Sequence, residues 1–439
     1  MKFHFSTNKM DDLDDTYALS LISLVMMLSM NLMLSNNIIK SYKTYVIRRV
    51  RASVSAIMYE LGSKSKNYCR MTDMSFWKLH DMLKDDIDKK SQNTSRRSRK
   101  KRRKSHIING MIHSSLRLSM ALRYFAGGCP LDIALVHGVS PCEINISVWK
   151  VADAVHNNKD LNIEYPSCHE QQKKIASEFK NKSYAGFDNC AGCIDGLLIW
   201  TSKPNEKDST VSQAGIKKFF CGRKKKFGLN MQGTCDAKGR FLDMCIGHPG
   251  STSDCLAFVT SVANSKFEKD GFLSPGLVIY GDNACVSNNY MVTPYKNVGK
   301  GSKDACNFYH SQVRIQIECS FGILVHRWAI LRKPFPQNMS LGKIAALTHC
   351  LCKLHNFCID ERENRHCDQT KMDRFCASLN GSIDVQEDTN GDKIPLDILH
   401  GGEHSEDFVR RNAPVDNAPR EKMLKLVREK DLRRPQNNS

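Results

Sequence analysis

The sequence predicts an α+β fold with a mixed sheet and flanking helices, preceded by an all-α helix-turn-helix region. Residues 115–157 carry apolar side chains at helical spacing, divided by short glycine-containing turns. Three short β-rich runs separated by turn residues then follow between 193 and 250, with a fourth buried-looking strand at 276–285. Helical spacing returns at 314–332. Consecutive strands followed by helices are typical of an α+β domain with a mixed sheet.

The composition predicts a partner that carries negative charge. The chain has 439 residues, enough for two or three domains, and a globular proportion of hydrophobic residues (41%). Lysine and arginine outnumber aspartate and glutamate by 65 to 46, which gives a net charge of +19. An excess of this size favours a polyanion, and we expect DNA.

Eight of the positive charges lie in residues 96–104, a run that includes Arg102 and Arg103. Such a run is typical of a nuclear localisation signal or a non-specific DNA clamp, and a solvated linker is the structural alternative. We therefore expect the protein to be nuclear and its basic linker to contact DNA.

The cysteines do not predict disulfides or a zinc site. No secretory leader is visible, so the 18 cysteines are expected to be reduced. Cys190 and Cys193, and the group at 350–358, lack a second ligand pair at the spacing of a zinc finger. We expect them to pack as small hydrophobic residues.

Residues 17–34 are apolar but short for a membrane span, which needs about 20 such residues. The polar residues in and beside this segment fall on one side of a helical wheel. A buried or docking helix is therefore favoured over a membrane span.

The stretch from 115 to 157 predicts a helix-turn-helix. One helix ends at Gly127 and Gly128, a second runs from Pro130 to about residue 137, and a third begins after a glycine turn with Ser140 as its N-cap. This pattern is used to place a helix in a DNA groove, and a plain three-helix core is the alternative.

Three acids are candidates for a metal centre. Asp195 lies near the start of the first strand, Asp282 ends the strand "VIYGD", and Glu318 lies on the late helix. A sheet with strand order 3-2-1-4 would place Asp195 beside Asp282, and a helix over the sheet would bring Glu318 to them. Clustered carboxylates suit Mg²⁺ or Mn²⁺, and two such ions can cleave a phosphodiester.

Thirty-five residues lie between Asp282 and Glu318, as between the last two catalytic acids of many integrases and transposases. Four blocks in order, at 220–254, 280–295, 317–331 and 351–361, resemble the signatures of the PIF/Harbinger superfamily of transposases and their domesticated nuclease relatives. The resemblance covers residues 68 to 360.

This resemblance implies a retroviral-integrase-like RNase H fold with Asp195, Asp282 and Glu318 as the catalytic, metal-binding triad. It further implies DNA cleavage with two Mg²⁺ or Mn²⁺ ions, strand transfer, a homo-oligomer and a Myb-like DNA-binding partner. Leu197 and Leu198 depart from the family pattern and put substrate positioning in doubt.

We divide the chain into four parts. The first is an N-terminal helical extension, the second a helical DNA-binding region with a basic linker at 88–106, the third an RNase H-like nuclease domain, and the last a polar, partly disordered tail that ends in a basic helix. Their ranges are 1–60, 61–160, 161–361 and 362–439.

Other charged residues are given narrower roles. Asp254 is interpreted as a helix N-cap, with a role as a helper acid at the metal centre as the alternative. The block Arg223, Lys224, Lys225, Lys226 is expected to contact phosphates. Arg314 is expected to pair with Glu318 one helical turn away.

Two functions follow from these observations. The first is a metal-dependent DNA endonuclease or transposase. The second is a non-catalytic, transposase-derived DNA-binding protein that uses the same fold for recognition alone.

Overall fold

The computed structural model describes residues 50–89, 111–361 and 418–435. The segment 17–34, the basic run with Arg102 and Arg103, and most of the tail after 361 lie outside these residues. Among the helices that the structure describes, none combines the length and apolar character that a membrane crossing requires.

A helical region comes first in the described chain. Its apolar stripes pack together, with Phe76, Leu79 and Leu83 of α4 fully buried. The helices are α2 (Val54–Leu61), α3 (Ser65–Cys69), α4 (Asp73–Asp88), α5 (Ser114–Phe125), α6 (Pro130–His137) and α7 (Pro141–Asn157), with the 3-10 turns η1 (Gly62–Lys64) and η3 (Lys159–Leu161). Helix α2 buries Val54, Ile57 and Met58 in the same core.

The two predicted helices and the glycine turn between them are present as α6 and α7, and the choice between a DNA-reading helix-turn-helix and a plain three-helix core stays a prediction. Gly138 ends α6 in the left-handed conformation (φ 61°), which favours glycine. Ser140 occupies the N-cap position of α7, as predicted, although its side chain makes no capping bond. Arg117 of α5 holds α7 by contacts to Glu143 (3.3 Å) and Ser147 (3.0 Å).

The second part is built on a six-stranded mixed sheet ordered β2-β3-β1-β5-β6, with β4 paired to β3. β1 and β4 are antiparallel to β3, whereas β5 is parallel to β1. The predicted order 3-2-1-4 and the α+β class are therefore confirmed. The strands are β1 (Cys190–Thr201), β2 (Phe220–Cys221), β3 (Lys226–Cys235), β4 (Phe241–Pro249), β5 (Val278–Tyr280) and β6 (Met291–Val292). The fourth predicted strand is shorter than expected.

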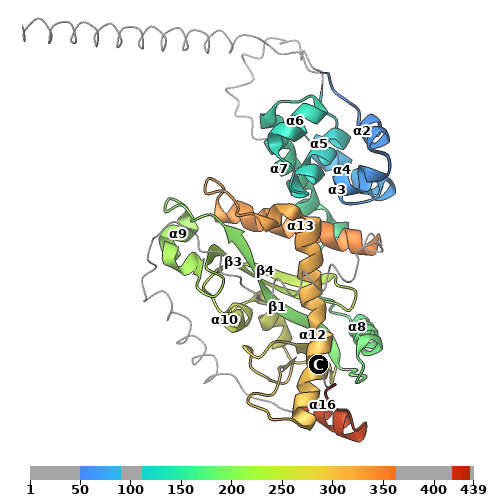
Figure 1. The fold of residues 1–439 in the computed structure, drawn as a ribbon, viewed down its shortest axis with the longest axis vertical. Coiled ribbons are helices and arrows are strands. Elements are labelled where there is room, and N and C mark those ends of the chain that lie inside the picture. Colours follow the sequence, from blue (N-terminus) through green and yellow to red (C-terminus); the bar gives the residue numbers. More distant parts are fainter. Residues whose placement is uncertain (1–49, 90–110, 362–417, 436–439) are drawn as a thin grey trace, which may run out of the picture. The chain divides into compact units, whose positions relative to one another are not determined.

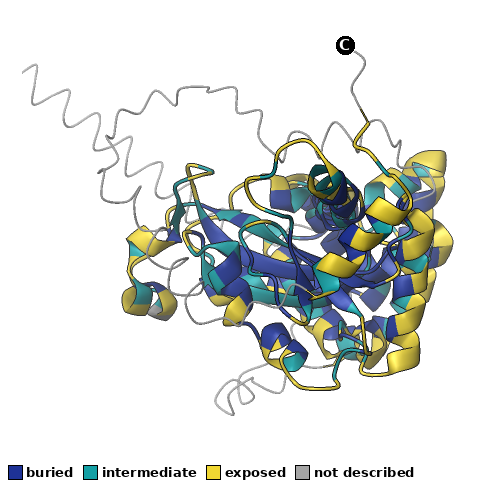
Figure 2. Cartoon of the chain, turned by 90° about the horizontal axis from the view of Figure 1, so that it is seen from below, coloured by how far each residue is buried: buried dark blue, intermediate teal, exposed yellow. Residues whose placement is uncertain are grey.

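Alternation along the strands separates the two faces of the sheet. Cys193 and Tyr280 pack into the larger apolar cluster, whereas their neighbours Ile194 and Ile279 pack into a second cluster. The second cluster includes Phe258, from one of the two short helices α10 (Asp254–Val259) and α11 (Val262–Phe267). Figure 2 shows the strands largely buried, with the exposed residues on the outer faces of the helices.

Three long helices contact the sheet, and α12 runs beside β1 (Figure 1). They are α8 (His169–Lys182), α12 (Ser302–Arg327) and α13 (Leu341–Asp360). The remaining short helices are α9 (Ser209–Ala214), η4 (Ile216–Phe219) and η5 (Ala329–Arg332). Helix α12 begins twelve residues before the predicted start at 314. Trp328 is fully buried, and Asn356 bonds both the N–H and the C=O of Phe241 (2.8 Å each), so both residues stabilise the packing of the domain.

The basic helix predicted near the end of the chain is present as α16 (Ala418–Glu429). It packs against α12 and buries Met423, Leu424 and Val427. The Tyr280 hydroxyl, at the end of β5, contacts Met423 Sδ at 3.4 Å. This helix is therefore part of the packed domain.

Candidate metal centre

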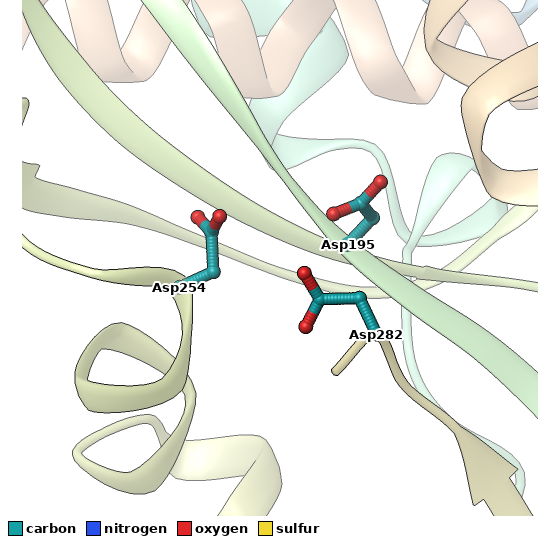
Figure 3. A group of neighbouring side chains, drawn as sticks. All are labelled: Asp195, Asp254 and Asp282. Carbon is teal, nitrogen blue, oxygen red and sulfur yellow. The ribbon is translucent and has the colours of Figure 1, made fainter. Parts of the chain in front are cut away.

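Three aspartates from separate segments converge at one end of the central strands. Asp195 lies on β1, Asp254 is the first residue of α10, and Asp282 follows β5. Each offers a carboxylate oxygen within 4.8 Å of the others (Figure 3). In the part of the chain that the structure describes, this is the one group of three or more acidic, histidine or cysteine side chains arranged to hold a metal ion.

Strand register explains why Asp195 and Asp282 meet. Cys193 of β1 pairs with Tyr280 of the parallel strand β5. Each aspartate lies two residues beyond this pair, so the two side chains are neighbours at the carboxyl end of β5. The predicted side-by-side placement is confirmed. The amide N–H of Gly196 donates to Asp195 Oδ1 (2.8 Å), and that of Ala284 donates to Asp282 Oδ1 (3.0 Å).

The interpretation of Asp254 as an N-cap is wrong. Ser253 caps α10, because its hydroxyl accepts from the amide of Leu256. The Asp254 carboxylate instead accepts hydrogen bonds at Oδ1 from the side-chain amides of Asn230 (3.0 Å) and Gln232 (2.9 Å), both on β3. These bonds orient the carboxylate toward the cluster, although its role as a helper acid stays a prediction.

Gly196 makes room for this arrangement. A Cβ atom at position 196 would lie 1.9 Å from Asp254 Oδ1 and 2.7 Å from Gln232 Nε2. Because the carboxylate belongs to a short side chain held by two amides, it has little freedom to withdraw. Glycine at this position therefore allows Asp254 to approach β1.

Glu318 lies outside the group of three aspartates, and one arginine connects it to them. Arg314 Nη1 lies 3.0 Å from Asp195 Oδ2, and Nη2 of the same guanidinium pairs with Glu318 Oε1. The predicted pair between Arg314 and Glu318 is confirmed, with Asp195 as an additional partner. The place of Glu318 in a catalytic triad stays a prediction.

The electrostatics of Asp195 reflect burial and crowding. Burial raises the pKa of its carboxyl group to about 6, against the opposing effects of Arg314 and the Gly196 N–H, and the Asp254 and Asp282 charges raise it further. Burial lowers the pKa of Arg314, but Asp195 and Glu318 outweigh this effect and hold it above its ordinary value. The negative charge of the clustered carboxylates thus exceeds the single positive charge of Arg314.

The basic turn between β2 and β3 borders the centre. Arg223 Nη2 lies 3.7 Å from Asp254 Oδ2, and its side chain is 75% exposed. Burial lowers the pKa of Lys224, and so does Arg223, whereas Asp195 raises it. Lys226 is placed differently, since its Nζ lies 3.9 Å from the centroid of the Trp200 ring. Lys225 has a positive φ of 51° in the turn.

The donor set fits a hard divalent cation. All three candidate ligands are half-buried carboxylates, and oxygen ligands of this kind suit Mg²⁺ or Mn²⁺. Three carboxylates this close repel one another unless a cation lies between them.

The cysteines are free thiols in the described part of the chain, and Cys190 and Cys193 lie 3.8 Å apart in the core, as expected for packing residues.

The sequence analysis did not predict that Asn230 and Gln232 belong to the centre. Asn230 and Gln232 are two residues apart in a buried strand, and two amides on one face of such a strand are a signal of a polar site. Asp236 is buried and accepts bonds from the backbone amides of Lys238 and Arg240. It stabilises the turn between β3 and β4.

A mixed sheet whose central parallel strands place two aspartates side by side, with a helix presenting a glutamate beside them, defines the RNase H-like class of domain. Residues 194–356 match the profile of the DDE superfamily endonuclease family. This segment is therefore similar to a DDE superfamily endonuclease domain, as the resemblance drawn from the four sequence blocks predicted.

Two proteins of Arabidopsis thaliana are similar to this chain. One, named ALP1-like, is 25% identical over 270 residues, which cover 58% of this chain and 62% of that protein. The other, named antagonist of like heterochromatin protein 1, is 25% identical over 294 residues, which cover 62% of this chain and 71% of that protein. The chain thus spans less than two thirds of the first relative. No solved structure matches.

Proposed function

We propose that this protein is a divalent-metal-dependent endonuclease that cleaves DNA phosphodiester bonds. The observation that carries the proposal is the convergence of Asp195, Asp254 and Asp282 within a DDE superfamily endonuclease domain. The net charge of +19 and the basic turn beside the aspartates support DNA as the substrate.

The side chains of the centre have different roles in the proposed reaction. A bound divalent cation would supply Lewis-acid chemistry and a water of lowered pKa. Asp195 and Asp282 hold their carboxylates in the shared space, and Asn230 and Gln232 orient Asp254 toward it. Arg223, exposed at the rim, is placed to attract a DNA phosphate toward the aspartates. Glu318 is proposed to complete the ligand set.

Further parts of the proposal follow from the resemblance. They are strand transfer after cleavage, nuclear localisation, assembly as a homo-oligomer, a Myb-like DNA-binding partner and a second metal ion. The basic run with Arg102 and Arg103 supports a nuclear role by composition alone.

A nicking assay on supercoiled DNA tests the proposal. With Mg²⁺ or Mn²⁺, the wild-type protein should convert the plasmid to open circles, and EDTA should stop the reaction. Asp195→Asn and Asp282→Asn should each lower the rate by at least about 100-fold, because removing a ligand charge weakens metal binding. DNA binding, measured by fluorescence anisotropy, should persist.

Asp304→Asn is the matched control, since Asp304 lies at the far end of α12 and pairs with Arg434 (3.0 Å). It should cleave like the wild type. Cleavage that survives EDTA, or that is undiminished in Asp195→Asn, would contradict the proposal.

A second candidate is a non-catalytic DNA-binding protein that uses the fold for recognition. The ion pairs of Arg314 with Asp195 and Glu318 favour it, because they neutralise two of the acids without a metal. DNA binding without metal-dependent nicking in the same assay would select this candidate.

A further inference from the structure

Arg314 reaches from α12 into the space between two of the proposed catalytic acids. One of its terminal nitrogens contacts Asp195 on β1, and the other contacts Glu318 one turn further along the helix. The side chains of Arg314, Asp195 and Glu318 are 17%, 19% and 13% exposed. One guanidinium thus compensates two largely buried carboxylates.

The other two aspartates of the centre accept their hydrogen bonds from uncharged donors, and Asp254 also lies 3.7 Å from the exposed Arg223. Asp254 accepts from the amides of Asn230 and Gln232, and Asp282 accepts from the backbone N–H of Ala284. Asp195 is therefore shared between two environments. It belongs to the group of three aspartates and also to the pair that Arg314 neutralises.

We propose that Arg314 is an internal cation that competes with a divalent metal ion for Asp195 and Glu318, so that Glu318 joins the metal centre only after the guanidinium has left it. The inference rests on the proposed function, because it concerns the metal centre of that reaction. Its physical basis is that buried carboxylates require a cation, and that two cations repel each other when they share the same ligands.

The chemistry of the guanidinium suggests where it goes. A DNA phosphate offers two oxygens in a geometry that matches the two terminal nitrogens of arginine. A phosphate at the centre could therefore replace Asp195 and Glu318 as the partner of Arg314. Glu318 would then become available when substrate is present.

Mn²⁺ binding to the full chain without DNA tests the inference by a readout other than activity. The variants are Arg314→Gln, Glu318→Gln and the double variant, measured by calorimetry or by electron paramagnetic resonance of free Mn²⁺. Arg314→Gln should bind Mn²⁺ at least about tenfold more tightly, since removing a cation at 4–6 Å from a carboxylate changes its cation affinity by this order.

The decisive result is the dependence on Glu318. Glu318→Gln should change Mn²⁺ affinity by less than about twofold in the wild type, yet weaken it by about tenfold in the Arg314→Gln background. The matched control is Arg434→Gln, which removes another arginine that pairs with α12 (Asp304, 3.0 Å) and should leave Mn²⁺ affinity unchanged.

Each outcome decides the question. Equal Mn²⁺ affinity of the wild type and Arg314→Gln, in a wild type that nicks DNA, would overturn the role of Arg314 and keep the proposed function. Binding by Arg314→Gln alone would support the role of Arg314, and the nicking assay, in which DNA is present, would then decide whether the wild type cleaves. If neither protein binds Mn²⁺, both proposals fail.

Arg314→Lys covers the case in which Arg314→Gln does not fold, as judged by circular dichroism. Lysine keeps the charge but cannot bond both carboxylates in the same fork. We therefore expect Arg314→Lys to bind Mn²⁺ more tightly than the wild type, but by less than the tenfold expected for Arg314→Gln. An affinity no greater than that of the wild type would count against the inference.

Discussion

Two of the regions expected to contact DNA lie in the described part of the chain, and they differ in the chemistry that they present. The helix-turn-helix of α6 and α7 has the backbone pattern of a DNA reader, but residues 124–149 contain no lysine or arginine. Its exposed side chains include Leu131 (66%), Leu135 (84%) and Ile146 (46%). The metal centre, by contrast, is bordered by the basic turn at 223–226.

The difference shows that backbone geometry and binding chemistry are separate properties. Most of the affinity of a protein for DNA comes from cations that replace counterions on phosphates. The one lysine of α6 and α7, Lys150, donates to the backbone carbonyls of Ile87 and Lys89, so this helix pair is better suited to packing or to protein contacts. On this basis, we expect DNA contact at the basic turn beside the sheet rather than at α6 and α7.

The largest expected effect comes from closing the space at Gly196. Gly196→Ala should lower both Mn²⁺ affinity and nicking by about 100-fold, because the new methyl group displaces the Asp254 carboxylate from its two amide donors. Gly247→Ala is the control, since a Cβ there meets nothing within 4 Å. Calorimetry with Mn²⁺ checks the first effect and the plasmid assay the second. Unchanged affinity in Gly196→Ala would show that Asp254 is not part of the centre.

A salt titration measures which of the two regions contacts DNA phosphates. The double variant Arg223→Ala/Lys224→Ala should bind duplex DNA more weakly, and the slope of log K against log salt concentration should become shallower by about 1 to 2, since each lost phosphate contact contributes about 0.9. Asn145→Ala on α7 should leave the slope unchanged. A shallower slope for the α7 variant alone would reverse the assignment of DNA contact.

The smallest effect concerns acid stability of the sheet domain. Burial lowers the pKa of His310 and of His355 to about 3, against the bonds that they make to the carbonyls of Val292 and Gly239. Below the ordinary histidine pKa near 6.5, the unfolded chain binds protons that the folded chain does not. The free energy of unfolding should therefore fall between pH 6.5 and about 3, by up to about 1.4 kcal/mol per pH unit for each histidine.

Urea unfolding at pH 7, 6 and 5 measures this dependence. His355→Asn should flatten it, whereas His169→Asn, at an exposed position on α8, should not. If His355→Asn keeps the full pH dependence, other groups are responsible for the loss of stability in acid.

The strand order of the sheet and the neighbouring positions of Asp195 and Asp282 could be predicted from the sequence alone. Strand alternation and a parallel neighbour are local and topological properties, so the 3-2-1-4 order placed Asp195 beside Asp282 without any coordinates. The helix-turn-helix boundaries followed in the same way from glycine and proline positions.

The remaining features depend on contacts between distant segments. Asp254 and Ser253 are both good capping residues, and only the bonds from Asn230 and Gln232 distinguish them. The second partner of Arg314 comes from a strand 119 residues away. The early start of α12 was missed because its first turns are polar, with Ala305, Tyr309 and Val313 as their buried side.

The docking of α16 has a practical consequence for biochemistry. This helix lies beyond the segment that matches the endonuclease family, yet it covers α12 and touches Tyr280, two residues before Asp282. A fragment cut at residue 361 would expose the apolar surface beneath Met423, Leu424 and Val427, a condition that promotes aggregation. Recombinant material meant for assays should therefore extend to residue 435.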